Sequence, residues 1–568
     1  MPTFSYKIKD IEKLVGAKIN NIEKYLEFLK IDYEIKGDEI SLEFKDVNRP
    51  ELWAIEILAR EIKAKMGKKI KNYGIKKSNF TINVDKNIIN IRPYIGAIIV
   101  EKVNINENFL KYLIQVQEAL AENYGKKRKY ISIGIYEFDK INWPVFYKAV
   151  FPEEIKFVPL DMEEELNLKQ ILKVHDKGIK YGYILENFDK YPILIDSKKN
   201  VLSFPPIINS NYSGKVEIGK KNLMVEVTAL QENFLDHTLD IFARIFLERG
   251  FKVYSVQINH PNGKKYYPQF KNIEIEIEKK DIDTAFNFSL NNKQMKDLAK
   301  KFLANIELKE IKKRFPLAIE ANKIKFIYPS YRYDIKGKDD VIEDLLIAYG
   351  YNKFKPEINK LELVTKAEED KNHIIYKKIS NIMISFAEEV LTNILINPSL
   401  FREMIKKKYK LVEVANPISQ NYSALRNYIF PNLLYFLSLN KQVNLPIKIF
   451  EIGNVLRVIN EKGEDIENNE ENGKIKEEIH LAYAAIGNDI TFTNAKQDLE
   501  FLFRNLNLNY ELEEIKHDSF IEGRVAKIIV NNKEIGFIGE IHPAILNNFK
   551  LFYPTLIFEI NLDELELI

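Results

Sequence analysis

Short runs of alternating apolar and polar residues near the start of the chain predict a β-hairpin. Residues 31–35 (IDYEI) and 40–44 (ISLEF) each alternate with a period of two, and the KGDE between them has the composition of a turn. Downstream, apolar residues recur at helical spacing from Leu52 to Ile62, directly behind Pro50, and proline is favoured at the first position of a helix. The first block is therefore expected to combine short helices with a hairpin.

The period of the apolar pattern changes several more times along the chain. From residue 85 to residue 270, apolar strands alternate with amphipathic helices, which predicts a mixed α/β domain. The next block opens on NIEIEIEKK, a half-buried strand by its alternation, and ends in a helix expected over 340–349, because Gly350 suits the position after a helix. The remainder has helices first and strands afterwards.

These changes predict a multidomain α+β protein. Its four blocks are residues 1–70, 85–270, 271–355 and 356–568. The lysine-rich stretch KAKMGKKIKNYGIKKSN (63–79) is expected to be a connector between the first two blocks. At 568 residues the chain is also too long for a single hydrophobic core, which agrees with several domains.

Composition and charge exclude several classes of protein. The chain is 46% apolar and 29% charged, which is typical of a folded globular protein rather than a disordered one. It has no run of about eighteen uncharged apolar residues and no secretory signal at its start, so we expect a cytoplasmic protein without membrane contact. The net charge of +3 does not favour wholesale coating of nucleic acid, although it permits local basic surfaces.

The absence of cysteine narrows the chemistry further. It excludes disulfides, thiolate metal sites and cysteine nucleophiles. The seven histidines include no pair at a metal-ligand spacing such as HxxxH. A bound metal is therefore expected to be a hard cation held by oxygen ligands.

Carboxylates crowd the junction between a loop and the helix expected over 340–349. They are Asp334, Asp339, Asp340, Glu343 and Asp344. Asp339 or Asp340 can cap the helix, and the helix dipole favours negative charge in the first turn. Residues 340, 343 and 344 also share one helix face, where like charges repel unless a cation neutralises them. From chemistry alone, helix capping and a Mg²⁺ cage completed by Asp334 both remain open.

Five motifs in a fixed order give the chain a family resemblance. They are DVNRPELW (46–53), VLSFPPIIN (201–209), PSYRYD (329–334) with the acidic residues after it, IFEIGNV (449–455) and IGFIGEIHP (535–543). Together they resemble the β subunits of phenylalanyl-tRNA synthetase, a class II aminoacyl-tRNA synthetase family, in the shorter archaeal and eukaryotic form. The resemblance covers nearly the whole chain.

The resemblance implies a role for each block. The first would be the family's N-terminal α/β module, the second its editing domain, and the third a small winged-helix-like module with a metal site. In the family, the residues matching Asp334, Asp340, Glu343 and Asp344 are Mg²⁺ ligands, whereas Asp339 matches none of them and is expected to cap the helix. The last block would be a degenerate class II synthetase core, an antiparallel sheet with helices.

The last block lacks residues that a working core of this class uses to form an adenylate. IFEIGNVLRVINE keeps Arg457, but Asn454 stands where an active core has a charged residue, and the next glutamate is displaced to Glu461. Arg426 and Arg524 are expected at a surface or an interface. We therefore expect a catalytically silent core packed against an active one. The implied partner is the α subunit, which binds ATP and phenylalanine and charges tRNA(Phe) within an (αβ)₂ heterotetramer.

In the family, the editing domain hydrolyses tyrosine wrongly attached to the tRNA. A pocket that accepts tyrosine must offer a polar partner to its hydroxyl. The matching segments supply substrate-binding candidates, Leu202, Ser203 and Asn209, and catalytic candidates, Ser210, Glu226 and Thr228. Glu226 and Thr228 share a strand face. We expect Glu226 to accept the phenol hydrogen bond, and the hydroxyls of Thr228 and Ser210 to position water or the ester.

The chain departs from the family pattern in this domain. Glu226 and Ala229 stand where the short-type family usually has aspartate and glycine, and Ala121 and Tyr136 replace histidines. A scaffold subunit with a decayed editing site is therefore one alternative function. A free-standing tRNA-binding or tRNA-deacylating protein is another.

Overall fold

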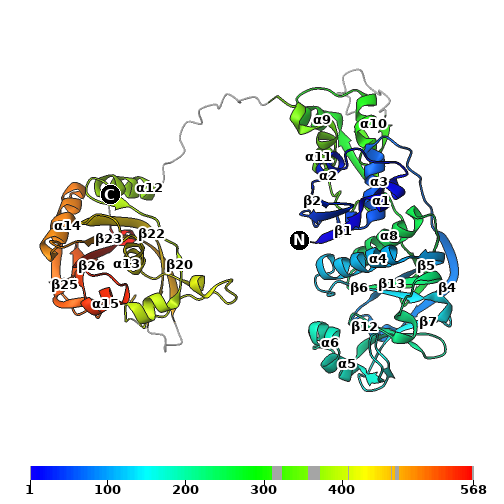
Figure 1. Cartoon of the computed structure of the whole chain (residues 1–568), viewed down its shortest axis with the longest axis horizontal. Helices are drawn as coiled ribbons and strands as arrows, with labels where there is room; N and C mark the ends of the chain where they lie inside the picture. Colours follow the sequence, from blue (N-terminus) through cyan, green and yellow to red (C-terminus); the bar gives the residue numbers. More distant parts are fainter. Residues whose placement is uncertain are drawn as a thin grey trace. The chain divides into compact units, whose positions relative to one another are not determined.

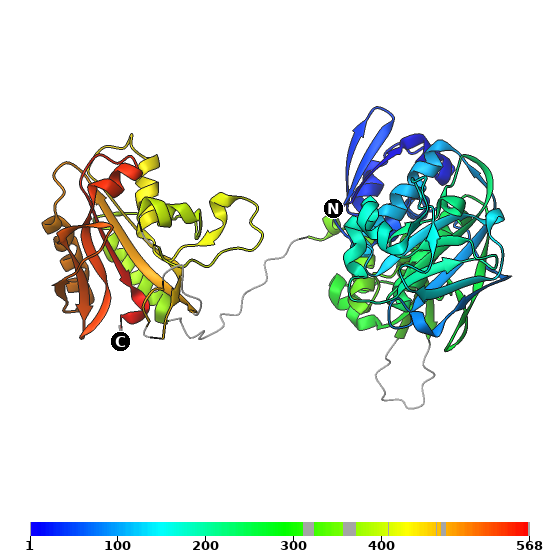
Figure 2. The same ribbon diagram turned by 90° about the horizontal axis from the view of Figure 1, so that it is seen from below.

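The computed structural model describes residues 2–309, 323–355, 371–406, 408–461, 463–466 and 473–565 (Figures 1 and 2). The chain divides into two compact units, Met1–Glu357 and Ile358–Ile568. This division lies two residues past residue 355, where the third predicted block ends. Each unit is described by itself below.

The predicted hairpin is present in the first unit. β2 (Ile31–Lys36) and β3 (Glu39–Phe44) pair antiparallel, and β1 (Thr3–Lys7) adds to the other side of β3. A 3₁₀ turn over Pro50–Trp53 leads into α3 (Ile55–Lys65), as the apolar spacing behind the proline predicted.

A ten-stranded sheet forms the centre of the first unit. Its order is β12-β11-β10-β7-β4-β14-β5-β13-β6, and β15 also pairs with β14. The strands are β4 (Lys76–Val84), β5 (Tyr94–Ile105), β6 (Ile131–Glu137), β7 (Val145–Val150), β10 (Tyr191–Ile195), β11 (Val201–Phe204), β12 (Ile208–Asn209), β13 (Gly219–Ala229), β14 (Lys252–His260) and β15 (Gly263–Tyr267).

β4 corrects two expectations, namely that the lysine-rich stretch is only a connector and that the central domain begins at residue 85. The strand pairs in parallel with both β14 and β7 in the interior of the sheet. Only Ile82 and Val84 of its side chains are buried, and Lys76 and Lys77 are exposed. The exposed lysines give this strand the composition of a linker, so the sequence pattern did not indicate a strand inside the sheet.

Helix α8 (Glu232–Glu248) lies between the central sheet and the N-terminal module. It packs on β5 and β13 and also against α3, so all of its residues 237–247 are buried. One hydrophobic core therefore runs from Trp53 and Ile57 in the N-terminal module, through Phe246 of α8, to the sheet. The first two predicted blocks are parts of one packed structure.

The third block has its own core. The strands β16 (Ile273–Glu278), β18 (Lys323–Tyr328) and β17 (Asn305–Lys309) pair antiparallel in that order. The helices α9 (Lys279–Phe286), α10 (Asn292–Lys300) and α11 (Lys338–Tyr349) contribute to the same core. Helix α11 ends at the predicted residue, before Gly350 with its φ of 105°, but begins at Lys338 rather than Asp340.

The second unit is built around a seven-stranded sheet, as expected for the last block. The order is β19-β22-β23-β27-β26-β25-β24, antiparallel except for the pair β19 and β22. Its elements are α12 (Lys371–Met383), β19 (Glu388–Glu389), α13 (Phe430–Leu439), β22 (Ile447–Ile459), β23 (Lys474–Ile486), α14 (Phe492–Leu506), β24 (Glu511–Glu514), β25 (Phe520–Val530), β26 (Lys533–Ile541), α15 (Pro543–Asn548) and β27 (Thr555–Asn561).

Both faces of this sheet are covered. Along β23, Ala482 and Ala484 belong to the core under α13 and α15, whereas Leu481 and Tyr483 belong to the core under α12 and α14. Successive residues of a strand point to opposite faces, which explains why this strand is apolar nearly throughout. No helix among the described residues is long and apolar enough to cross a membrane.

Candidate functional site

A cavity of about 340 Å³ lies in the central domain of the first unit. It is lined by residues 203–209 of the VLSFPPIIN motif, by α4 (Glu107–Ala119), and by the neighbouring strands β6 and β13. Three of the six residues predicted for the pocket, Ser203, Asn209 and Glu226, line this one cavity. Residues of this motif and of β13 therefore contribute to the wall of one cavity.

The other three predicted residues do not line the cavity. Leu202 is fully buried in β11. The Ser210 hydroxyl accepts a hydrogen bond from the backbone nitrogen of Tyr212 at 3.2 Å and begins a short helical turn. Position 210 therefore has a local structural role, and the expectation that its hydroxyl faces the substrate is not met.

Thr228 is also engaged elsewhere, although it shares the strand face of Glu226. Its Oγ1 accepts a hydrogen bond from Nε of Arg92 at 2.8 Å and lies 2.8 Å from the Ser132 hydroxyl. Arg92 is 1% exposed and also donates to the Thr228 carbonyl at 3.0 Å. Thr228 therefore satisfies a buried arginine, and the expectation that it orients water in the cavity is not met. Arg92 lies in none of the sequence motifs, so no motif indicated its contact with Thr228.

Glu226 is a buried carboxyl group in the wall of the cavity. It is 2% exposed, and its Oε2 accepts a hydrogen bond from the hydroxyl of Tyr136 at 2.9 Å. Its Oε1 is buried and has no hydrogen-bond partner among the described residues. Burial raises the pKa of Glu226 to about 8, although the Tyr136 hydrogen bond and the charge of Arg92 favour the ionised form. Near pH 7 the side chain is mainly neutral, so it can both donate and accept hydrogen bonds.

Gly134 makes the contact between Tyr136 and Glu226 possible. Both Gly134 and Tyr136 lie on β6, and Gly134 is paired with Glu226 on β13. A Cβ at position 134 would lie 2.1 Å from the Tyr136 hydroxyl oxygen. The tyrosine ring thus extends over Gly134, which has no side chain.

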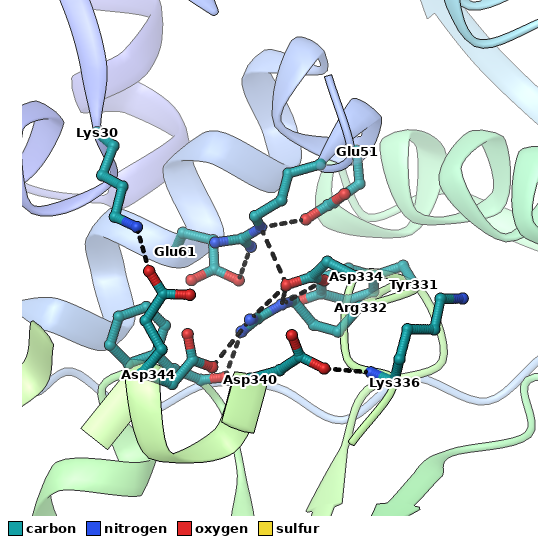
Figure 3. Close-up of polar contacts among 12 residues, drawn as sticks. Lys30, Glu51, Glu61, Tyr331, Arg332, Asp334, Lys336, Asp340 and Asp344 are labelled. Atoms are coloured by element: carbon teal, nitrogen blue, oxygen red, sulfur yellow. Dashed lines mark hydrogen bonds and ion pairs between the residues drawn. The ribbon is translucent and has the colours of Figure 1, made fainter. Parts of the chain in front are cut away.

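The acidic junction predicted as a Mg²⁺ cage is organised around an arginine (Figure 3). Arg332 is 1% exposed, and its Nη2 lies 2.8 Å from Oδ2 of Asp334 and 2.8 Å from Oδ2 of Asp344. Burial opposes the ionisation of both carboxyls. For Asp334 the Arg332 guanidinium outweighs burial and lowers the pKa to about 2, whereas for Asp344 burial prevails and raises the pKa.

The remaining carboxylates of the junction have separate partners. Asp340 accepts hydrogen bonds from the backbone nitrogens of Lys336 at 2.7 Å and Gly337 at 2.8 Å. Because α11 begins at Lys338, Asp340 rather than Asp339 satisfies the free N–H groups at its start. Glu343 forms a surface ion pair with Lys30 of the N-terminal module, and both side chains are about half exposed.

The arginine cluster also joins the third block to the N-terminal module. Arg49 donates from Nε to Glu51 at 2.8 Å, lies 3.4 Å from Glu61 on α3, and lies 3.9 Å from Asp334. Burial raises the pKa of Glu51 to about 7, whereas Glu61 is held at a pKa of about 2 because Lys65 and Arg49 outweigh its burial. Arg49 and Arg332 stand inside the NRP and SYRYD motifs, and their charge was the signal that could have identified this cluster.

These contacts do not form a cation cage. Among the described residues, no group of three or more histidine, aspartate or glutamate side chains could hold a metal ion. Asp334 and Asp344 face a guanidinium, Asp340 caps a helix, and Glu343 faces Lys30. The four residues predicted as ligands thus do not fit a Mg²⁺ ion in this arrangement, and Mg²⁺ binding stays a prediction.

In the second unit, the arginines considered in the sequence are held by ion pairs. Arg457 donates to Asp465 at 2.8 Å and lies 3.3 Å from Glu478. Arg426, expected at a surface or an interface, is instead 1% exposed within the chain and donates to Glu451 at 2.8 Å. Gly453 leaves the space for it, because a Cβ there would lie 2.4 Å from Nη2 of Arg426.

Two family models match consecutive parts of the chain. Residues 275–351 match the tRNA synthetase B5 domain, and residues 360–562 match the phenylalanyl tRNA synthetase beta chain CLM domain. These ranges fall within the third and fourth predicted blocks.

Whole-length relatives and a solved structure agree with the family models. The phenylalanine–tRNA ligase beta subunit of Pyrococcus horikoshii is 38% identical over all of both chains, and that of Methanosphaera stadtmanae is 32% identical over all of both chains. The crystal structure of an N-terminal fragment of the phenylalanyl-tRNA synthetase beta-subunit from Pyrococcus horikoshii is 36% identical. It covers 62% of this chain and 100% of the fragment, with a TM-score of 0.57.

Proposed function

Because this chain belongs to the family of phenylalanine–tRNA ligase β subunits, we propose that it works with a separate α subunit that charges tRNA(Phe), and that its own central domain hydrolyses mischarged tyrosyl-tRNA. The α subunit would bind ATP and phenylalanine, and the two chains would assemble as an (αβ)₂ heterotetramer. The observation that carries the hydrolytic part is the cavity lined by Ser203, Asn209 and Glu226.

The polar groups of the second unit support placing adenylate formation on another chain. Arg457 already faces two carboxylates, Asp465 and Glu478. His480 is 3% exposed and lies between Glu478, at 3.3 Å, and Glu559, at 2.8 Å. Arg457 and His480 would have to give up these carboxylate partners before they could hold triphosphate.

An exposed apolar surface on the second unit supports a protein partner. Leu391 is 82% exposed, Leu439 is 60% exposed and Tyr435 is 49% exposed, and all three line a cavity of about 400 Å³ beside α13. Monomeric proteins rarely leave such residues together in water. We propose that the α subunit covers this surface, within an interface of obligate type that buries more than about 2,000 Å² in total.

The cavity of the central domain suits the end of a mischarged tRNA. In the wall of the cavity, two buried atoms have no hydrogen-bond partner among the described residues and could meet a substrate hydroxyl, Oε1 of Glu226 and Oγ of Ser203. A buried polar atom left without a partner is destabilising, so a ligand that supplies one gains affinity. The carboxyl would select for the hydroxyl of tyrosine, while a water molecule attacks the ester between the amino acid and the tRNA. Thr228 and Ser210 do not line the cavity, whereas Ser203 does, so the Ser203 hydroxyl would orient that water in their place.

A second candidate function has one observation in its favour. Tyr136 already donates a hydrogen bond to the carboxyl that would recognise the substrate hydroxyl. If this contact closes the pocket to substrate, the chain would be a scaffold subunit whose hydrolytic site has decayed.

A deacylation assay separates these functions. The complex with the α subunit would be incubated with tyrosyl-tRNA(Phe), and release of tyrosine would be followed. Hydrolysis by the unmutated complex supports the proposal, and its absence supports the scaffold. Glu226→Ala should slow hydrolysis about ten- to a hundred-fold, the loss expected for a hydrogen bond to an ionisable group, with phenylalanine charging unchanged. Glu186→Ala, at an exposed position of the same domain, is the matched control.

A further inference from the structure

The hydroxyl of Tyr136 lies between two polar side chains that line the cavity. Its ring is fully buried, and its hydroxyl lies 2.9 Å from Oε2 of Glu226 and 3.4 Å from Oδ1 of Asn209. Glu226 and Asn209 line the cavity, whereas Tyr136 does not and lies behind its wall. Two of the polar residues that face the cavity thus converge on a phenol that belongs to the chain itself.

A glycine beside the Tyr136 ring leaves the space that the ring occupies. Gly134 lines the cavity and leaves the space that the phenol enters, since even a methyl group there would lie 2.1 Å from the hydroxyl oxygen. The carboxyl of Glu226 turns Oε2 toward the Tyr136 hydroxyl, and its Oε1 has no hydrogen-bond partner in the part of the chain that the structure describes. Gly134, Glu226 and Asn209 thus contact the tyrosine and also line the cavity.

We propose that Tyr136 is a built-in plug, a specificity-determining residue that fills a phenol-binding extension of the cavity and limits the entry of hydroxylated aromatic groups. This inference rests on the proposed function for the identity of the substrate, but the phenol site itself is defined by Gly134, Glu226 and Asn209. Removing the ring should open a space with polar groups at its inner end. Cavities made by truncating buried rings can take up small aromatic molecules, and here a phenol should bind better than a hydrocarbon because it can satisfy the carboxyl.

The test uses p-cresol, which is the side chain of tyrosine as a free molecule, and toluene, which lacks its hydroxyl. The melting temperature of the α–β complex would be measured for the unmutated chain, Tyr136→Ala and Tyr136→Phe. We expect p-cresol to raise the melting temperature of Tyr136→Ala in a saturable way, and toluene to raise it less. Neither compound should change the unmutated chain or Tyr136→Phe, because in both of them a ring still fills the space.

A second variant and a second measurement keep the inference testable. Should Tyr136→Ala fail to fold, Tyr136→Leu retains an apolar side chain and still removes the ring. In deacylation of tyrosyl-tRNA, both variants should raise kcat/KM about tenfold, the factor expected for one additional hydrogen bond. Added p-cresol should reverse that gain.

The outcomes distinguish this inference from the proposed function. Equal stabilisation of the unmutated chain and Tyr136→Ala by p-cresol, or no stabilisation of either Tyr136→Ala or Tyr136→Leu, would overturn the plug. Tyrosyl-tRNA hydrolysis without any response to p-cresol would leave the proposed function and overturn the plug. A response to p-cresol without hydrolysis in any variant would support the plug and overturn the proposed hydrolysis.

Discussion

The guanidinium of Arg332 lies 2.8 Å from the carboxylate of Asp344, and both side chains are buried. Asp334 lies on the same guanidinium, so one arginine holds two of the carboxylates that sequence chemistry would give to a metal ion. A delocalised cation with several donors can satisfy both, because guanidinium and carboxylate match in geometry. The positive charge at this junction comes from the chain itself.

Removing Arg332 should destabilise the first unit strongly. Arg332→Met would leave Asp334 and Asp344 without their main counter-charge, which typically costs about 3–5 kcal/mol for a buried pair. Both tryptophans of the chain, Trp53 and Trp143, lie in this unit, so their fluorescence during denaturant unfolding would report the loss. Lys169→Met, which removes an exposed pair with Glu153 in the same unit, is the control and should change stability by less than about 1 kcal/mol. Similar losses for both variants would contradict the role given to Arg332.

The acidic junction should not depend on Mg²⁺ for its stability. Asp344→Asn removes one partner of Arg332, and its melting temperature should fall by the same amount in Mg²⁺ and in chelator. If Asp344 were a Mg²⁺ ligand, the unmutated chain would gain stability from the ion and the variant would not, so the difference would grow with Mg²⁺ concentration. Such growth would restore the metal site that the sequence predicts. Glu343→Gln, at the exposed pair with Lys30, should have little effect in either condition.

Glu226 should make the first unit less stable as pH rises. Its pKa is about 8 in the folded chain and about 4.5 when unfolded, so between these values the folded state holds the proton more tightly. The stability that protonation provides is fully present below about pH 4.5 and is lost as pH rises through 8. Relative to Glu226→Gln, which keeps the shape and cannot ionise, the unmutated chain should therefore lose stability from pH 5 to pH 8. A difference in melting temperature that does not change with pH would show that the carboxyl is not buried as described.

The fit of Tyr136 over Gly134 predicts a coupled pair of substitutions. Gly134→Ala should destabilise the chain by about 1–3 kcal/mol, because the new methyl group displaces the Tyr136 hydroxyl. Gly74→Ala, where nothing lies within 4 Å of the added atom, is the matched control. In Tyr136→Leu the hydroxyl is gone, so Gly134→Ala should then cost much less, and a double-mutant cycle would measure the difference. Strict additivity would mean that the two residues do not meet.

The sequence predicted the elements well where the apolar period was clear. The hairpin at 31–44, the helix that ends before Gly350, and the strand of Glu226 all follow from local patterns. β4 was missed because lysines on its solvent side look like a linker, although Ile82 and Val84 carried the alternation.

The side-chain partners could not be predicted in the same way. The shared strand face of Glu226 and Thr228 follows from their spacing, but Arg92, which binds Thr228, is 136 residues away in the sequence. Arg332 belongs to the PSYRYD motif, so its charge was visible in the sequence. A cluster of carboxylates, however, predicts a nearby positive charge without indicating whether a metal ion or an arginine provides it. Tertiary packing decides between those two cations.

In the function proposed above, the α subunit forms the adenylate and this chain does not. The most direct test is phenylalanine-dependent ATP–pyrophosphate exchange by the purified chain alone, by the purified α subunit alone, and by the two together. We expect no exchange from this chain alone and exchange by the α–β complex, whose phenylalanine charging of tRNA(Phe) also requires both chains. Exchange catalysed by this chain alone would contradict this division of roles.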